Sequence, residues 1–252
     1  MIKIELKIII IASMLKVEVV LSPALLHLFD AKNKNVVVID ILRATSTICT
    51  AIHHGALAIK PVNNTDEALI LKGSGYLTAA ERDGHKLDGF DMGNSPFECM
   101  NGAVLNKKIA LTTTNGTKCI TAATIAGAAN VLAGSFLNIS AIAQFLIADK
   151  RDVVLFCAGW KDSVNLEDSL FAGALAEKIS TKEAIECDST LMVIDLYNRA
   201  KANIGQYLEQ SSHYKRLSRL HHREDMEYCL KSDEMDIVVG LKSGEMVKLQ
   251  VN

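Results

Sequence analysis

The sequence is poor in the residues that mark several common protein classes. It has only 3 prolines, and 5% of its 252 residues are aromatic. So few aromatic side chains do not suit a single-strand nucleic-acid binder, which stacks bases on such rings. Basic residues number 27 and acidic residues 29, so the net charge is −2, with no long run of either sign. This balance argues against a dedicated nucleic-acid surface, and we expect no nucleic-acid partner.

The 6 cysteines lack the close pairing that zinc and dithiol redox sites need, because no two of them form a C-x-x-C motif. This spacing predicts reduced, mostly buried thiols of a cytoplasmic protein. Residues 1–13 combine lysines with an apolar run that is too short to span a bilayer and has no clear signal-cleavage site. We therefore expect a cytoplasmic protein without a membrane partner, and a dispensable leader at residues 1–13.

Several catalytic motifs are also missing. The sequence contains no G-x-G-x-x-G, no G-x-x-x-x-G-K-[ST], no H-E-x-x-H and no G-x-S-x-G. Their absence disfavours dinucleotide-binding, P-loop, zincin and α/β-hydrolase functions. No cysteine is followed six residues later by arginine, and Asp40 is followed by Ile41 and Leu42 rather than by a paired aspartate. The cysteine phosphatases and the haloacid-dehalogenase phosphatases are therefore excluded as well.

From Met14 onward, short β-branched runs alternate with longer stretches of helical period. This alternation predicts an α/β fold, a three-layer α/β/α arrangement around a mostly parallel sheet. The C-terminal third predicts two or three helices between Thr190 and Lys231, then a hairpin at a sheet edge. We predict strands near residues 17–21, 36–41, 58–62, 76–79, 109–111, 131–133 and 153–156, a hairpin of 237–241 with 246–251, and helices at 44–54, 117–126, 139–148 and 166–179.

Two domain organisations remain open. Residues 14–252 form either one catalytic α/β unit or two packed βαβ lobes of about residues 14–110 and 111–252. A weak repeat at a spacing of 72 residues, which places Thr45 on Thr117 and Gly55 on Gly127, suggests related halves. The small residues that any two βα units share at their helix ends explain the same matches.

Polar residues cluster where the predicted strands end, which is where parallel sheets bind ligands. Asp40 ends one strand and is followed by Arg43, and Glu81 with Arg82 follows another. Residues 112–117 are small and polar and open a helix. Such a loop can cradle an anion through unpaired N–H groups and the helix dipole, although N-capping alone explains part of the pattern.

The loop before Phe97 carries more polar groups than a helix start requires. Ser95, Pro96 and Glu98 predict a capping box. Asp91 and Asn94 come just before it and could approach an anion at the same helix end. Carboxylates near such loops suit a hard cation such as Mg²⁺, although acids are also common in ordinary first helical turns. The carboxylates so placed are Asp40, Glu81, Asp91, Glu167 and Asp168.

Several segments of the sequence, most of them the polar loops described above, resemble the 2-phosphosulfolactate phosphatase family in their residues, their order and their spacing. The resemblance runs from about Met14 to the C-terminus, with departures at Tyr214, where glycine is expected, and at residues 238–240, where Val-Pro is expected. It implies an Mg²⁺-dependent phosphatase that releases phosphate from 2-phosphosulfolactate to give 3-sulfolactate in coenzyme M biosynthesis. The blocks are residues 40–48, 81–82, 89–96, 112–117, 134–138, 157–159 and 167–168.

On this basis we assign roles as expectations. Asp40 is the general base or the nucleophile, and Arg43 is the second catalytic residue. We expect a small anionic phosphorylated substrate and an Mg²⁺ cofactor, and we leave a homo-oligomer open. His213, Asp225 and Cys157 remain undecided. The substrate-binding candidates are Arg82, Asn94, Ser95, Thr114, Asn115 and Gly116, and the metal candidates are Glu81, Asp91, Glu167 and Asp168.

Two alternatives stay open at this point. The first is a metal-dependent phosphatase that acts on another small phosphorylated acid. The second is a protein that binds an anionic metabolite without turnover. A pure anion receptor gains nothing from acidic residues beside its ligand, so Asp40, Glu81 and Asp168 favour an enzyme.

Overall fold

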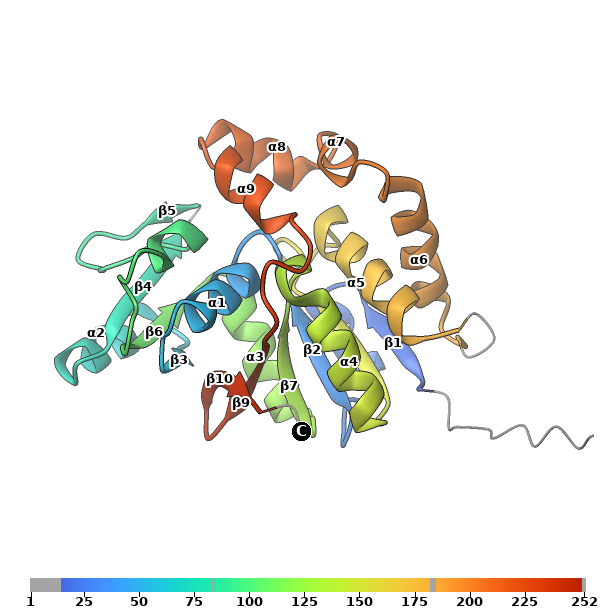
Figure 1. Cartoon of the computed structure of the whole chain (residues 1–252), viewed down its shortest axis with the longest axis horizontal. Coiled ribbons are helices and arrows are strands. Elements are labelled where there is room, and N and C mark those ends of the chain that lie inside the picture. Colours follow the sequence, from blue (N-terminus) through green and yellow to red (C-terminus); the bar gives the residue numbers. More distant parts are fainter. Residues whose placement is uncertain (1–14, 83, 182–184, 251–252) are drawn as a thin grey trace, which may run out of the picture.

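The computed structural model describes residues 15–82, 84–181 and 185–250, and the predicted leader at residues 1–13 lies outside them. A sheet of ten strands runs through this part of the chain, with helices on both of its faces (Figure 1). The predicted α/β/α class is therefore confirmed. The strand order is β1-β8-β2-β7-β9-β10-β3-β6-β4-β5. The strands are β1 (Val17–Val20), β2 (Asn35–Ile39), β3 (Ala58–Pro61), β4 (Leu77–Arg82), β5 (His85–Lys86), β6 (Lys108–Thr112), β7 (Asn130–Gly134), β8 (Val153–Cys157), β9 (Val238–Lys242) and β10 (Glu245–Leu249).

The helices follow the predicted ones closely in the first two thirds of the chain. They are α1 (Ala44–His53), α2 (Thr65–Gly73), α3 (Gly116–Ile125), α4 (Ile139–Asp149), α5 (Leu166–Ile179), α6 (Asp188–Ala200), α7 (Ile204–Leu208), α8 (Ser212–Arg219) and α9 (Arg223–Cys229), with short 3-10 turns η1 (Pro23–Leu28), η2 (Pro96–Cys99) and η3 (Phe136–Asn138).

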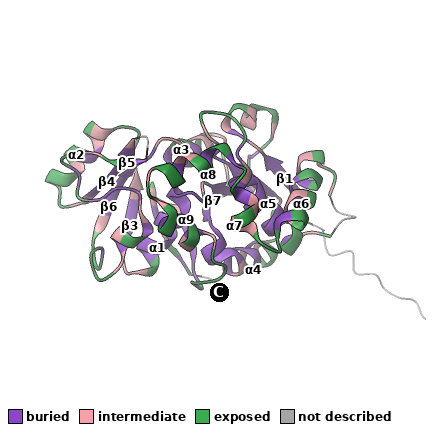
Figure 2. Ribbon diagram, turned by 90° about the horizontal axis from the view of Figure 1, so that it is seen from above, coloured by how far each residue is buried: buried purple, intermediate pink, exposed green. Residues whose placement is uncertain are grey.

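The central strands are buried on both faces. All five residues of β2 are buried, as expected for a parallel strand covered on two sides. Val37 packs with α4 and α5, whereas the next residue, Val38, packs with α1 and α3 on the opposite face. Two large apolar cores result, one on each side of the sheet, and a smaller third cluster includes Ala68 of α2. In Figure 2 the buried strands lie between helices whose outer surfaces are exposed.

The predicted hairpin forms, but its predicted position at a sheet edge is wrong. β9 pairs with β7, and β10 pairs with β3, so the hairpin joins the two parallel halves of the sheet. Val238, Val239 and Met246 are buried between these halves. An apolar hairpin at the end of a chain is compatible with either position, because its partner strands are more than 100 residues away in sequence.

The C-terminal region contains four helices rather than the expected two or three. The extra one, α7, is a single turn of 5 residues that begins at Ile204, and the side chain of its N-cap, Asn203, accepts a hydrogen bond from the Gln206 N–H. One turn is too short to show a helical period. Helix α2 was not predicted for a related reason, since Ala68 is its single buried residue and no apolar stripe marks it.

One parallel half of the sheet combines strands from both sides of residue 110, and β6, in the other half, spans that residue. β1 and β2 pair with β7 and β8 in one half, whereas β3 and β4 pair with β6 in the other. The division of the chain into two lobes at about residue 110 stays a prediction. Within residues 15–82, 84–181 and 185–250, none of the helices has the length and apolar character needed to cross a membrane.

Candidate active site

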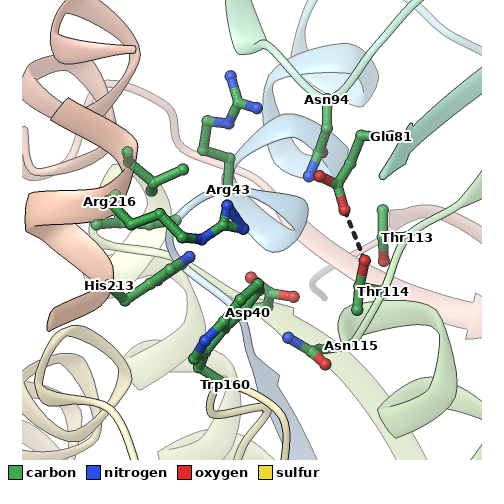
Figure 3. A pocket seen from close by; sticks show the side chains of 12 residues that line it. Asp40, Arg43, Glu81, Asn94, Thr113, Thr114, Asn115, Trp160, His213 and Arg216 are labelled. Carbon is green, nitrogen blue, oxygen red and sulfur yellow. Dashed lines mark hydrogen bonds between the residues drawn. The ribbon is translucent and has the colours of Figure 1, made fainter. Parts of the chain in front are cut away.

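A small pocket, open to solvent, lies where strands of both halves of the sheet end beneath α8 (Figure 3). β2 contributes Asp40 from one half, and β4 and β6 contribute Glu81 and Thr114 from the other. The walls are mainly polar and carry both signs of charge. They consist of Asp40, Leu42, Arg43, Glu81, Asn94, Thr113, Thr114, Asn115, Trp160, His213, Arg216 and Leu217.

Asp40 faces the centre of this pocket from the residue directly after β2. Burial in a poorly polarisable environment raises the pKa of its carboxyl group to about 6. The negative charges of Glu81 and Glu167 act in the same direction, whereas His213 and the Ala44 N–H oppose them. A carboxylate with a pKa near 6 can accept a proton close to neutral pH, which suits a general base.

The approach of helix α3 to Asp40 depends on Gly116. A Cβ atom at this position would lie 2.8 Å from the Ala44 Cβ atom and 3.0 Å from an Asp40 carboxylate oxygen. Any side chain here would collide with Ala44 and Asp40 and force α3 away from α1. Gly116 therefore shapes the site by its small size, a role that our assignment to substrate binding did not include.

The loop after β6 holds Glu81 in place. Thr114 Oγ1 donates a hydrogen bond to Glu81 Oε1 at 2.9 Å, and the Gly84 N–H donates to Glu81 Oε2 at 2.7 Å. Asn115 Nδ2 donates to the Gly159 carbonyl at 3.2 Å. The hydroxyls of Thr113 and Thr117 bond to each other's backbone groups, as helix caps do. Thr114 and Asn115 are the side chains of this loop that line the pocket without forming part of the helix cap.

Arg43 is oriented by the C-terminal helix α9. Its guanidinium pairs with Asp225, and both residues are buried, with side chains 4% and 8% exposed. Arg43 Nη1 also lies 3.1 Å from His222 Nδ1, while His222 Nε2 bonds to the Gly84 carbonyl at 2.7 Å. A carbonyl only accepts hydrogen bonds, so Nε2 carries the His222 proton and Nδ1 accepts from Arg43. Burial and the nearby Arg43 lower the pKa of His222, which favours this neutral ring.

A second buried pair of polar side chains, His213 and Glu167, lies beneath the opposite wall. Glu167 in the first turn of α5 is fully buried, and its Oε1 atom is 2.5 Å from His213 Nδ1. Ser211, the N-cap of α8, donates its hydroxyl to Glu167 Oε2 at 3.2 Å. Both carboxylate oxygens of Glu167 are thus engaged by α8, and Glu167 does not line the pocket.

Trp160 forms the floor under His213 and Arg216. Its ring stacks on the His213 ring, with centroids 4.9 Å apart and planes 16° apart, and the Arg216 guanidinium lies 4.0 Å from the Trp160 ring centroid. Gly159 permits the turn that presents Trp160, because its φ is +61° and a Cβ atom would lie 2.3 Å from the Ser163 carbonyl. The Arg216 guanidinium therefore reaches the pocket, whereas the Arg43 guanidinium is buried against Asp225 and points away from Asp40 (Figure 3).

Asp168 is a structural anchor behind the pocket. Its carboxylate accepts hydrogen bonds from the Ile41 N–H, the Gly159 N–H and Asn165 Nδ2, each at 3.0 Å. Burial raises the pKa of Asp168 well above its usual value, as do Asp40 and Glu167, and the two backbone donors oppose this rise. Asp168 ties the loops after β2 and β8 to the start of α5.

Besides Gly116, Glu167 and Asp168, three other predicted site residues lie outside the pocket lining. Arg82 donates to the Glu81 carbonyl at 2.7 Å, and Ser95 donates its hydroxyl to Asp225 at 2.6 Å, within the capping box that the sequence predicts. Asp91 accepts from the Thr78 N–H and hydroxyl, each at 2.8 Å, and pairs with Lys72. Partial burial acts to raise the pKa of Asp91, but Lys72 and Thr78 lower it to about 2.

The arrangement suits a metal that needs few protein ligands. Within the described residues, no three histidine, cysteine, aspartate or glutamate side chains gather as a ready-made metal cage. Mg²⁺ does not need one, since it commonly binds one or two carboxylates together with substrate phosphate and water. Glu81 and Asn94 both line the pocket, and Asn94 Oδ1 is buried without a hydrogen-bond partner among the described residues. A carboxylate beside an unsatisfied amide oxygen fits such a cation.

Sequence reasoning missed Trp160 and Arg216 as site residues and left His213 and Asp225 undecided. His213 and Arg216 lie on α8, three residues apart, and so share one helix face. This spacing was the available signal. Nothing local shows that this face covers a strand end that lies more than 170 residues earlier in the chain.

Comparison with known proteins places the chain in one family. The family model for 2-phosphosulpholactate phosphatase matches residues 20–244. Proteins named "Probable 2-phosphosulfolactate phosphatase" are 39% identical over 85% of this chain in Caldanaerobacter subterraneus, 36% over 92% in Thermotoga maritima and 32% over 92% in Clostridium acetobutylicum. These alignments cover 90%, 97% and 100% of the relatives. The chain therefore belongs to the 2-phosphosulfolactate phosphatase family, a family of phosphoric monoester hydrolases.

Proposed function

We propose that this enzyme hydrolyses 2-phosphosulfolactate to 3-sulfolactate and phosphate in an Mg²⁺-dependent reaction in the cytoplasm. The observation that carries the proposal is the pocket itself, where Asp40, whose carboxyl pKa is raised to about 6, shares the lining with Arg43, Arg216 and Glu81. Family membership supports the substrate. The six free thiols, five of them buried, support a reducing compartment.

The charge of the pocket suits a small acid with several anionic groups. 2-Phosphosulfolactate carries a phosphate, a carboxylate and a sulfonate on three carbons. Arg216 offers a planar set of N–H donors that matches such oxygens, Arg43 adds positive charge at the pocket wall, and Asn115 adds an amide on the other side. The pocket therefore recognises charge and shape together and leaves little room for a large substituent.

Asp40 acts on the attacking water in this proposal. Its carboxylate accepts a proton as the water oxygen bonds to phosphorus, and Arg43 stabilises the charge on the phosphoryl oxygens. Hydrolysis of phosphate monoesters without a catalyst is among the slowest known reactions, requiring up to ~10²¹-fold acceleration, so fixed charges around the phosphoryl group are essential.

The residues that would hold Mg²⁺ are Glu81 and Asn94. Thr114 and Gly84 keep the Glu81 carboxylate turned toward the pocket, and the Asn94 amide oxygen has no competing donor within the described residues. When bound there, Mg²⁺ supplies positive charge that polarises the phosphoryl oxygens. The other predicted metal ligands have different partners. Glu167 bonds to His213, Asp168 accepts from backbone N–H groups, and Asp91 pairs with Lys72.

The proposal predicts both a substrate preference and a metal requirement. Phosphate release should be fastest from 2-phosphosulfolactate in a panel of phosphorylated 2-hydroxy acids, because the second arginine needs a second anionic group. EDTA should abolish release, and added Mg²⁺ should restore it. A faster rate on another acid would reassign the substrate. Tight binding of 2-phosphosulfolactate without release of phosphate would indicate a binding protein. Full activity in EDTA would show that the reaction needs no metal.

Cys157 is predicted to be dispensable for turnover. It is fully buried at the end of β8, and burial raises its thiol pKa well above the usual value, so it is a poor nucleophile. Cys157→Ala should keep kcat/KM for 2-phosphosulfolactate within a few-fold and lower the melting temperature slightly, because a small cavity forms. A loss of about 10³-fold at an unchanged melting temperature would instead identify a covalent catalyst.

A further inference from the structure

We propose that His213, held by Glu167, donates the proton that the leaving oxygen of the substrate needs when the phosphate ester breaks. This inference rests on the proposed phosphatase reaction and adds a second catalytic residue to it. The evidence is the placement of the His213 ring between a buried carboxylate and the pocket, on the helix that covers Asp40.

The hydrogen bond to Glu167 determines which ring nitrogen faces the substrate. The carboxylate of Glu167 only accepts, so His213 Nδ1 carries a proton toward it. Nε2, on the far side of the ring, is then directed away from Glu167. Figure 3 shows the His213 side chain extending from α8 into the pocket, toward the space between Arg216 and Asp40. The negative charge of Glu167 compensates the positive charge of the ring when both nitrogens are protonated.

The surroundings of His213 prevent the ring from turning. Trp160 stacks on one face with planes 16° apart. Ser211 bonds to the second oxygen of Glu167 and caps α8 through the Tyr214 N–H, so the carboxylate and the start of the helix are connected. These contacts exceed what packing of a histidine against α5 requires. They hold a proton-bearing nitrogen at a fixed point of the pocket wall.

Asp40 and His213 complement each other across the pocket. Both line it, and the positive charge of His213 acts on the Asp40 carboxyl group. As the water oxygen bonds to phosphorus, its proton passes to Asp40. The bond between phosphorus and the ester oxygen breaks, and its electron pair goes to the ester oxygen, which takes the proton from His213 Nε2. The products are the alcohol and phosphate, and water then returns the proton from Asp40 to His213.

The leaving group provides the test. An alkoxide needs a proton as it departs, whereas 4-nitrophenolate leaves readily without one. We would measure kcat for one alkyl phosphate and for 4-nitrophenyl phosphate, both cleaved by the wild-type enzyme, in His213→Gln. For the alkyl ester kcat should fall by ~10²- to 10⁴-fold, and for 4-nitrophenyl phosphate it should fall by less than ~10-fold. Glu167→Gln, which keeps His213 but removes the charge behind it, should show the same selectivity with a smaller loss.

The ratio of the two rates within one variant does not depend on how much of the protein is folded. A destabilised variant therefore still answers the question. As a matched control, His221→Asn changes an exposed histidine just after α8 and should leave both rates unchanged. Equal losses on the two esters in His213→Gln, or an unchanged rate on the alkyl ester, would overturn the assignment. A wild-type enzyme that cleaves no phosphate ester would instead contradict the proposed function itself.

Discussion

Asp40→Asn is expected to lower kcat for 2-phosphosulfolactate by ~10³-fold or more, while KM and the melting temperature change little. Asparagine has nearly the same shape as aspartate but cannot accept the proton of the attacking water. The structure places this carboxylate in the pocket and raises its pKa to about 6, so the loss should fall on the chemical step rather than on binding.

Steady-state kinetics of phosphate release, with calorimetric melting of the same samples, checks this prediction. Asp66→Asn is a matched control, because Asp66 is an exposed carboxylate in the first turn of α2, far from the pocket lining. Its kinetics should equal those of the wild type. If Asp40→Asn also retained wild-type kcat, the reacting centre would have to lie elsewhere, and the role assigned to the loop after β2 would be wrong.

Asp225→Ala is expected to destabilise the protein by about 3–5 kcal/mol. Removal of Asp225 leaves the guanidinium of Arg43 buried without its compensating charge, and Ser95 loses the acceptor of its hydroxyl. For a chain of this size, the loss corresponds to a fall in melting temperature of about 6 to 20 °C. Because Arg43 also lines the pocket, kcat/KM should fall as well.

The same helix offers the control for this result. Glu227 on α9 pairs with Arg223, but these side chains are 60% and 74% exposed. Glu227→Ala should change the free energy of unfolding by no more than about 0.5 kcal/mol, because exposed pairs contribute little. Thermal or denaturant unfolding distinguishes the two variants. Similar small losses in both would mean that α9 does not hold Arg43 through a buried charge.

The fold was largely predictable because its signals are local. The runs at residues 36–41 and 153–156 and the stretch at residues 166–179 are long and apolar enough to show their type, and β2, β8 and α5 form there. The position of the β9–β10 hairpin was not predictable. It depends on pairing with β7 and β3, whose residues lie far away in sequence, and no turn or period within residues 237–251 encodes that choice.

The site residues that follow strands were predictable from the sequence, whereas those on helices were predictable only in part. Strand ends identify Asp40, Arg43, Glu81, Thr114 and Asn115, because parallel strands expose the residues that follow them. Carboxylates at helix starts are ambiguous by comparison. Glu167 and Asp168 share the first turn of α5, yet one supports His213 and the other binds the backbone of the loops after β2 and β8. Only tertiary contacts decide between such roles.

A crystal structure of the enzyme with Mg²⁺ and vanadate, which mimics the phosphoryl group, tests the central claim most directly. We expect vanadate in the pocket between Asp40 and the Arg216 guanidinium, with the metal at Glu81 and Asn94. A second hollow lies beside the hairpin and is lined by Gln144, Asp236 and Lys248. Vanadate and metal bound there, with the Asp40 pocket empty, would contradict the account.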